Sequence, residues 1–451
     1  MQIRFVSALV AMSLLAGCSK QLGFDIATGY AAKQVCSGVF VAGLPEDHLL
    51  EYDVMMTVAA LGPLRPLLKV DVDREQRMVR AGLLGATAKA FFTGTTGCVL
   101  HGEGFHAPDA QPIAAVDSTV AKPPAPASVM PALEPALDAA FAEPEEGQRK
   151  TLAILVSHRG KLIAERYARP ASAHTPMQSW SMNKSLMSTW IGMQAERGLL
   201  DTTAPLAPQL TSSSASLAAQ LDPTLNLEHL LHMESGLNFL EQYGPGSDVT
   251  RMLYSEPGAW RVAAAKGHTH APGEFFYYSS GDTNLASWFW QQSLSEPYIE
   301  WVQREFAEPL ALGAVVAEHD ATGTQVGSSY TFMTARDWLR VGEFWLSAYQ
   351  GQSPLLSAEW MQVAVAPRAA ATDGNYGRGF WLNTKGVDFP ALPKDLFYAA
   401  GHNGQYVMVF PRHALVIVRL GLTYGEGPIN GVEALAAAVL EVISEDQTAG
   451  R

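Results

Sequence analysis

The chain has 451 residues, of which 48% are hydrophobic and 17% are charged, which is enough apolar sequence for the cores of two or three domains and excludes a protein that is disordered throughout. Its 31 Lys and Arg residues against 44 Asp and Glu residues give a net charge of −13, so nucleic acid is excluded as a partner. No apolar run reaches the ~18 residues that a membrane span requires, which excludes a polytopic membrane protein.

Residues 1–17 resemble a secretory signal peptide, in which Arg4 precedes an apolar stretch that ends at Ala16. The following glycine and Cys18 complete a segment similar to the bacterial lipobox, where the cysteine is lipidated and becomes the first residue of the mature protein. Ser19, rather than Asp, follows, as in Gram-negative lipoproteins of the outer membrane. We therefore expect a lipid anchor on Cys18 in the cell envelope, at the outer membrane facing the periplasm. The alternative is an ordinary secretory signal with a chance cysteine.

Two cysteines, Cys36 and Cys98, remain once Cys18 is assigned to lipid. An even pair in an exported protein favours a disulfide. The bridge would close a loop of about 60 residues and stabilise the fold by very roughly 4 kcal/mol. The alternative is two buried thiols.

Residues 19–104 contain short apolar runs that are broken by turn residues. The runs predict strands at Leu68–Val72, Met78–Leu84 and Ala88–Thr93, with Asp73–Gln76 as the turn between the first two. We expect a small β-rich domain here, with a structural or interaction role that the sequence does not reveal.

Residues 105–131 are rich in proline and alanine and predict a linker, because such a composition does not build a core. The main domain is expected over residues 132–451. Strand pairs near both of its ends, with helices between them, predict an α+β fold whose sheet is shared by the two ends. The expected elements are strands Thr151–Ser157, Leu162–Tyr167, Gln405–Phe410 and Leu415–Leu420, and helices Ser185–Leu199 and Gly431–Ile443.

The first chemical motif is Ser181-Met182-Asn183-Lys184 at the expected start of a helix. Residues three apart lie on the same helix face, so Ser181 and Lys184 are neighbours. A helix N-terminus disfavours a nearby ammonium, which suits an unprotonated lysine that activates a serine nucleophile. By itself the motif is weak, because a chain of this length holds about one by chance.

The second motif is the segment Pro272–Ser280, which contains Tyr277 and Tyr278 after a Pro-Gly turn. A tyrosine hydroxyl close to the Ser–Lys pair could carry a proton to a leaving group. By itself the segment is weak as well, because paired aromatic residues are more often part of a core.

The third motif is Gly401-His402-Asn403-Gly404-Gln405, which opens an apolar strand. Glycines at a strand edge let backbone N–H groups approach a reacting carbonyl, as an oxyanion hole requires. By itself, His402 is more often a surface or hydrogen-bonded histidine.

In this order the three motifs resemble the serine β-lactamase and penicillin-binding-protein superfamily, which has an SxxK serine, a YxN-type tyrosine and a KTG or HxG strand. The closer match is to the class C-like serine hydrolases, which include esterases and 6-aminohexanoate-dimer hydrolase. Three further segments carry the resemblance, which covers roughly residues 150–445. They are Asn226–Leu237 (NLEHLLHMESGL), Gly327–Trp338 (GSSY…TARDW) and Tyr376–Trp381 (YGRGFW).

The resemblance implies an antiparallel sheet with flanking helices and a helical subdomain, with the site between them. It implies that Ser181 is the acylated nucleophile and Lys184 its general base. Tyr278 would be the proton relay, and is preferred to Tyr277 because it stands five places after the glycine of the turn, as in the family. The implied activity is that of a serine hydrolase without a cofactor.

The same resemblance assigns binding roles to the third motif. His402, Asn403 and Gly404 would bind substrate, and the backbone N–H groups of Ser181 and Gln405 would form the oxyanion hole. The segment that begins at Glu241 also resembles the 6-aminohexanoate-dimer hydrolase type. Its Tyr243 is expected to line the pocket, with plain packing as the alternative.

Two departures from the family pattern affect the expected activity. Ser280 stands where the YxN box has its Asn, and His402 replaces the KTG lysine, which helps to hold the substrate carboxylate in β-lactamases. A histidine is mostly neutral at pH 7 and holds a carboxylate less well. We therefore expect an esterase or amidase that acts on a small-molecule or peptide-like substrate. The alternatives are a penicillin-binding D-Ala-D-Ala carboxypeptidase or β-lactamase, and a catalytically inactive envelope-binding lipoprotein.

His268, His270 and Glu274 together form a weak metal-ligand pattern, because an HxH pair lacks further spaced ligands. We expect no metal site there. The chain also lacks the GxSxG elbow of the α/β-hydrolases.

Overall fold

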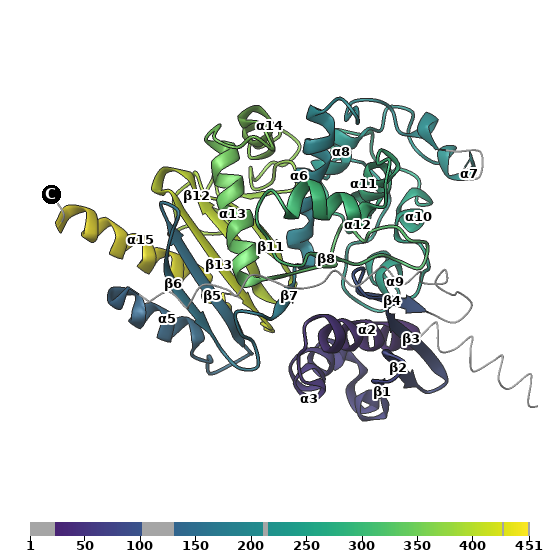
Figure 1. Ribbon diagram of the computed structural model, residues 1–451. Helices are drawn as coiled ribbons and strands as arrows, with labels where there is room; N and C mark the ends of the chain where they lie inside the picture. The colour runs from purple at the N-terminus through teal and green to yellow at the C-terminus, as the bar shows by residue number, and fades with distance from the viewer. Residues whose placement is uncertain (1–22, 102–129, 211–214, 426–427, 450–451) are drawn as a thin grey trace, which may run out of the picture.

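The computed structural model describes residues 23–101, 130–210, 215–425 and 428–449 (Figure 1). The expected signal peptide, Cys18 and most of the expected linker lie outside the described residues. Within the described ranges, no helix combines the length and the apolar character needed to cross a membrane.

The centre of the main domain is a six-stranded antiparallel sheet, in which strands from both ends of the domain are neighbours. Strands β5 (Thr151–His158) and β13 (Leu415–Gly421) pair along most of their length, and both are almost entirely buried. Long runs of Ile, Val and Leu favour strands that are covered on both faces. The prediction of a sheet shared by the two ends is confirmed. The order is β10 (Trp381–Leu382), β11 (Phe397–Gly401), β12 (Gln405–Phe410), β13, β5 and β6 (Lys161–Tyr167).

Helices cover both faces of this sheet (Figure 1). Helix α13 (Ala335–Tyr349) packs on one face, and α5 (Glu134–Phe141) and α15 (Val432–Ala449) pack on the other. Side chains alternate along β5, so Leu155 belongs to the first core and Ile154 to the second.

A helical subdomain lies beside the sheet, and α6 (Asn183–Glu196) is buried between the two (Figure 1). The sequence predicted this helix over Ser185–Leu199. The observed helix begins earlier because a 3₁₀ turn leads into it, and ends earlier because Gly198 takes a left-handed φ of 70°. The other helices are α7 (Ala215–Ala218), α8 (Leu227–Leu231), α9 (Asp248–Tyr254), α10 (Ala259–Ala264), α11 (Ser280–Gln292), α12 (Tyr298–Trp301) and α14 (Ala358–Ala364). A three-stranded sheet joins β7 (Pro176–Gln178), β9 (Thr331–Thr334) and β8 (Val316–Ala317).

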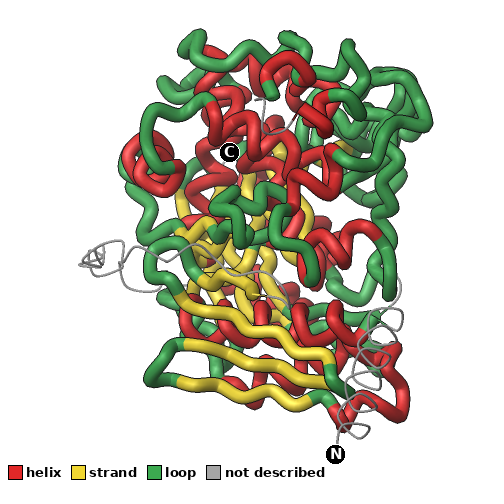
Figure 2. Tube along the Cα trace, turned by 90° about the vertical axis from the view of Figure 1, so that its right-hand side faces the viewer, coloured by secondary structure: helices red, strands yellow, loops and turns green. Residues whose placement is uncertain are grey.

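The N-terminal unit, residues 23–101, contains a four-stranded antiparallel sheet that includes the three predicted strands. Helix α2 (Phe24–Cys36) lies between this sheet and α9, and was not predicted. Because α2 is buried on nearly all sides, it lacks the polar face that marks an amphipathic helix. The sheet lies at one end of the molecule (Figure 2). The elements are β1 (Lys69–Asp73), β2 (Met78–Leu83), β3 (Ala86–Phe92) and β4 (Cys98–His101), with short helices α3 (Glu46–Leu49) and α4 (Met55–Thr57).

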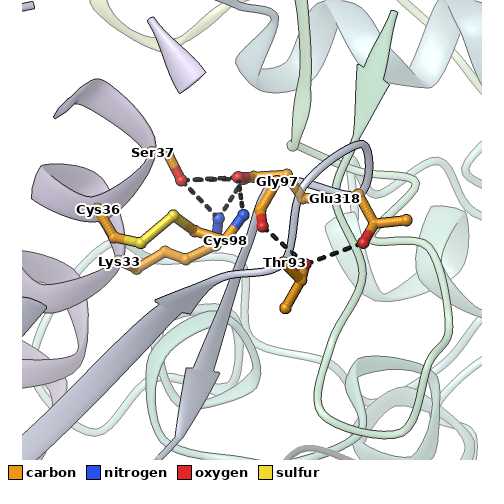
Figure 3. The surroundings of a disulfide bond; sticks show 8 residues. Lys33, Cys36, Ser37, Thr93, Gly97, Cys98 and Glu318 are labelled. Atoms are coloured by element: carbon orange, nitrogen blue, oxygen red, sulfur yellow. Dashed lines mark hydrogen bonds and ion pairs between the residues drawn. A yellow bond between two sulfur atoms is a disulfide. The ribbon is translucent and has the colours of Figure 1, made fainter. Parts of the chain in front are cut away.

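Cys36 and Cys98 form a disulfide that joins α2 to β4 (Figure 3). Of the two alternatives for this pair, the structure has the bridge rather than two thiols. Beside it, the buried carboxylate of Glu318 forms an ion pair with Lys33 and accepts a 2.7 Å hydrogen bond from the backbone N–H of Cys98. Ser37 donates to the same carboxylate at 2.8 Å. The disulfide therefore holds together two segments that bind one residue of the main domain.

Candidate active site

Ser181 lies in the 3₁₀ turn Trp180–Met182, directly before α6. It is partly exposed, whereas its two neighbours in the turn are buried. The turn is fixed by Ser179, whose hydroxyl accepts a 3.1 Å hydrogen bond from the N–H of Thr331 and donates to the carbonyl of Ser329 at 3.0 Å. The serine hydroxyl is therefore presented to solvent by a buried, hydrogen-bonded turn.

Lys184 lies one helical turn beyond Ser181 and is only 2% exposed. Its Nζ is 3.1 Å from Ser181 Oγ and 3.0 Å from Ser280 Oγ, and donates to the Ser328 carbonyl at 3.3 Å. Burial lowers the pKa of Lys184 to about 8, against the raising effect of nearby carboxylates. An amine with this pKa is unprotonated in part of the molecules at neutral pH, and can accept a proton from a hydroxyl at this distance.

Tyr278, rather than Tyr277, lies beside the Ser–Lys pair. Lys184 Nζ is 4.8 Å from the centre of the Tyr278 ring, which stacks on Trp381 at 5.1 Å and meets the edge of Tyr376 at 5.8 Å. Burial raises the pKa of Tyr278, against the lowering effect of its hydrogen bond with Ser181. The phenol is therefore protonated at neutral pH and can both donate and accept a hydrogen bond.

Ser280, which departs from the YxN pattern, links Lys184 to a carboxylate. Its Oγ accepts the hydrogen bond from Lys184 and donates to Glu241 Oε1 at 2.6 Å. The backbone N–H of Ser280 donates to Glu241 Oε2 at 2.8 Å, and Tyr243 donates to Oε1 at 3.2 Å. A loop glutamate thus lies one hydroxyl away from the buried amine.

The third motif forms a tight turn between β11 and β12, close to the nucleophile turn. Gly401 approaches the backbone so closely that a Cβ there would stand 2.3 Å from the Ser179 carbonyl oxygen, which only glycine allows. Beneath the turn, Arg419 is 1% exposed and donates to the carbonyls of Asn403 at 3.2 Å and Gly404 at 2.7 Å. The turn therefore brings Gln405, at the start of β12, next to the segment of Ser181.

His402 lies in a cluster of aromatic rings. It stacks on Tyr243 at 6.2 Å, and it meets Trp180 edge-on at 5.2 Å and Tyr424 at 5.8 Å. Although His402 is exposed as a residue, protein atoms packed around its ring desolvate the imidazole and lower its pKa to about 4. The side chain is neutral at pH 7. Tyr243 is 56% exposed, so it lies at the surface over His402 rather than in a core.

The histidines of the weak metal pattern have other partners. His268 Nε2 accepts a 2.9 Å hydrogen bond from the N–H of Asp222, and its Nδ1 is 3.1 Å from the Ser235 carbonyl. His270 stacks on Phe275. In the part of the chain that the structure describes, His, Cys, Asp and Glu side chains form no group of three or more that could hold a metal ion.

The family model of the beta-lactamases matches residues 136–441, which lie within the predicted main domain. The chain belongs to the beta-lactamase family. It is accordingly a serine hydrolase, and both the recognised family and the α+β fold with a helical subdomain are confirmed. No curated protein sequence matches this beta-lactamase-family hydrolase.

Several solved structures share the fold of this beta-lactamase-family hydrolase. A Bacillus anthracis protein assigned by name to the 6-aminohexanoate-dimer hydrolases has 18% identity and a TM-score of 0.56, over 66% of this chain and 80% of the other. EstCE1, a hydrolase with promiscuous acyltransferase activity, has 16% identity and a TM-score of 0.55, over 68% and 97%. A D-stereospecific amidohydrolase from Streptomyces sp. has 16% identity and a TM-score of 0.50, over 67% and 97%.

Two groups at the site of this beta-lactamase-family hydrolase were not among the residues predicted from motifs. Glu241 contacts Ser280 across 39 residues, and Trp180 precedes the nucleophile with a φ of 45°. A loop carboxylate carries no local pattern, so the Glu241 segment predicted only the position of Tyr243. Trp180 had no signal, because backbone strain is not visible in a sequence.

Proposed function

We propose that this hydrolase cleaves a carboxylic ester or amide through an acyl-enzyme on Ser181, with Lys184 as general base and Tyr278 as proton relay. The observation that carries the proposal is the 3.1 Å contact of Lys184 Nζ with Ser181 Oγ, at a lysine whose pKa is lowered to about 8. A serine hydroxyl becomes an effective nucleophile when a neighbouring base accepts its proton.

In the acylation step, Ser181 Oγ forms a bond to the substrate carbonyl carbon and its proton passes to Lys184. The carbonyl electron pair moves onto oxygen, where the backbone N–H groups of Ser181 and Gln405 would stabilise the negative charge. The bond to the leaving group then breaks, and the proton from Lys184 reaches the departing alcohol or amine through the hydroxyl of Tyr278.

Deacylation reverses the roles with water as the nucleophile. Water attacks the acyl carbon while its proton passes through Tyr278 to Lys184, and the resulting tetrahedral species is held by the same N–H groups. The ester bond to Ser181 then breaks, Oγ takes the proton back, and a carboxylic acid leaves. Atoms and charges balance without a cofactor.

The charge around the third motif favours substrates that lack a carboxylate at this position. His402 is neutral, and Arg419 is buried beneath the turn, where its guanidinium donates to the carbonyls of Asn403, Gly404 and Arg149. His402, Asn403, Gly404 and Tyr243 would then contact the substrate by polar and aromatic interactions. Family membership keeps a penicillin-recognising enzyme as the second candidate, although this site offers no cation from the motif to hold the penicillin carboxylate.

The cellular location proposed is the envelope, with a lipid anchor on Cys18 at the outer membrane facing the periplasm. It is supported by the sequence of residues 1–19 and by the Cys36–Cys98 disulfide, a bond typical of oxidising compartments. Cys18→Ser should release the protein from the membrane fraction and abolish labelling with radioactive palmitate. Retention at the membrane with unchanged labelling would contradict the anchor.

The function is tested by labelling the protein with a fluorophosphonate probe and mapping the modified peptide by mass spectrometry. We expect a stoichiometric adduct on Ser181 that is absent in Ser181→Ala and in Lys184→Ala. Ser188→Ala, buried two turns further along α6, is the matched control and should label normally. Normal ester turnover by Ser181→Ala would overturn the proposal.

Two further outcomes separate the alternatives. Labelling of Ser181 by a fluorescent penicillin, with turnover of a β-lactam, would favour the second candidate. A folded protein that reacts with neither probe would favour a catalytically inactive envelope-binding lipoprotein.

A further inference from the structure

The N-terminal unit reaches the active site through the buried carboxylate of Asp53, which is 4% exposed. Asp53 Oδ1 accepts hydrogen bonds from the hydroxyls of Tyr30 at 2.5 Å and Tyr424 at 2.7 Å. The Tyr424 hydroxyl in turn accepts a 3.2 Å hydrogen bond from Asn403 Nδ2. Two successive hydrogen bonds, from Asp53 through Tyr424 to Asn403, therefore join the N-terminal unit to the turn that precedes Gln405.

The ring of Tyr30 makes the second connection. It stacks on Trp180 at 6.5 Å with an interplanar angle of 11°. Trp180 is the residue immediately before Ser181, and its ring also meets that of His402 edge-on. One tyrosine of α2 thus contacts Trp180 by its ring and Asp53 by its hydroxyl.

Both contacted residues of the main domain have left-handed backbone conformations. Trp180 has a φ of 45° and Asn403 a φ of 62°. A bulky residue such as Trp180 keeps a left-handed conformation only where the surroundings impose it, and such residues concentrate at active sites. Trp180 is adjacent to Ser181, and Asn403 is two residues before Gln405. Each of the two expected oxyanion-hole amides is therefore next to a backbone that the N-terminal unit helps to hold.

A further attachment keeps the unit in place. The carboxylate of Glu318 forms an ion pair with Lys33 and accepts hydrogen bonds from Ser37 and from the N–H of Cys98 (Figure 3). The backbone N–H of Glu318 donates to the carbonyl of Tyr330 at 2.7 Å. Lys33 Nζ also lies 4.3 Å from the centre of the Tyr330 ring. This segment continues into Ser328 and Ser329, which contact Lys184 and Ser179. The unit is thus bound on two sides of the nucleophile.

We propose that the N-terminal unit is a component of the active site, in which Asp53 and Tyr30 are positioning residues that set the oxyanion-hole amides through Asn403 and Trp180. This inference rests on the proposed function and gives a role to a region that the motifs left without one. The unit acts through Tyr424 and Trp180 and does not touch the reacting atoms.

The test compares Asp53→Ala with Asp53→Asn, which retains one acceptor oxygen for the two tyrosine hydroxyls. Tyr52→Phe, which changes a hydroxyl on the same segment but leaves Asp53 intact, is the matched control. For each full-length variant, kcat and KM for p-nitrophenyl butyrate, the rate of fluorophosphonate labelling and the thermal unfolding midpoint are measured.

We expect Asp53→Ala to lower kcat and the labelling rate together by about 10- to 100-fold, the range known for small misplacements of a reacting group. KM should stay within about 2-fold, since ground-state binding is not what an oxyanion hole governs. The kcat and labelling rate of Asp53→Asn should lie between those of Asp53→Ala and those of Tyr52→Phe, which should be unchanged from wild type. Assays are run well below every unfolding midpoint, so the fraction folded does not contribute.

Wild-type kcat in a folded Asp53→Ala protein would overturn the inference. An equal loss of kcat in Val79→Ala, which only weakens the core of the N-terminal unit, would overturn it as well. If Asp53→Ala does not fold, Tyr424→Phe removes the hydroxyl that connects Asp53 and Thr57 to Asn403. Wild-type kcat in that variant would overturn the inference equally. A wild-type protein that neither labels nor turns over ester would instead contradict the proposed function.

Discussion

Ser280 Oγ lies 3.0 Å from Nζ of Lys184 and accepts a hydrogen bond from it. The same hydroxyl donates to Glu241 at 2.6 Å, so it is polarised by a carboxylate that the YxN pattern does not contain. An asparagine at this position would offer Lys184 its side-chain carbonyl oxygen directly, with no carboxylate needed to polarise it. The serine side chain is shorter, but its hydroxyl donates to Glu241 and so offers Lys184 a polarised oxygen acceptor in place of that carbonyl. The departure from the family pattern therefore preserves a hydrogen-bond acceptor for the amine.

Ser280→Ala removes this acceptor and is expected to lower kcat for an ester by about 10- to 100-fold, as for the loss of one hydrogen bond to a charged group. Ser280→Asn, which restores the family residue, should recover a measurable part of that loss. Steady-state kinetics and the rate of fluorophosphonate labelling measure both. Equal activity of Ser280→Ala and wild type would show that Lys184 does not depend on this contact.

The pH dependence of kcat/KM should report the state of Lys184. The amine is effective as a base only when it is unprotonated, and its pKa is lowered to about 8 by burial. Activity should therefore rise with pH and level off above an inflection at about pH 8. A profile that is flat from pH 6 to pH 10 would exclude Lys184 as the base.

Glu241→Gln is expected to move this inflection to lower pH. The negative charge of Glu241 raises the pKa of Lys184, so an uncharged amide of the same shape leaves burial to lower the pKa further. Glu300→Gln, an exposed change on α12, removes one charge that does not act on the pKa of Lys184, and should leave the inflection unchanged. An inflection that moves upward in Glu241→Gln would reverse the sign of the interaction and contradict this account.

The central sheet could be predicted because the residue composition of its strands is by itself typical of buried strands. Strands β5 and β13 are runs of Ile, Val and Leu with few polar residues, and their burial on both faces matches that composition. Ser181, Lys184 and Tyr278 could be predicted because they lie in short segments of fixed spacing. The structure places all three in contact.

The contacts that support these residues could not be predicted, because they join distant segments. Asp53 and Tyr424 are 371 residues apart, and neither lies in a recognisable motif. Helix α2 is buried against both its own sheet and α9, so its sequence shows no polar stripe. One sequence carries no signal for such pairings, which depend on how the two ends of the chain meet.

His402→Lys restores the cation of the KTG pattern at the turn. We expect the variant to gain affinity for substrates that carry a carboxylate next to the scissile bond, because His402 is neutral and Arg419 stays buried. KM should fall for a carboxylate-bearing ester and should not fall for its methyl ester. Labelling by fluorescent penicillin should increase as well. A lower KM for both esters alike would show that the new side chain acts by packing rather than by charge.

Gly29→Ala tests the close packing of α2 against the main domain. A Cβ at position 29 would stand 2.0 Å from the carbonyl oxygen of Tyr254, and backbone atoms do not move aside cheaply. Overpacking of ~1–3 kcal/mol should outweigh the gain of up to ~1 kcal/mol from alanine in a helix. Gly82→Ala on β2 is the control, because its nearest atom would be 3.9 Å away. Urea unfolding should show a loss of stability for Gly29→Ala alone. Because Tyr30 directly follows Gly29 on α2, kcat of Gly29→Ala should fall as well. Equal stability of Gly29→Ala and Gly82→Ala would show that α2 and α9 are not packed so closely.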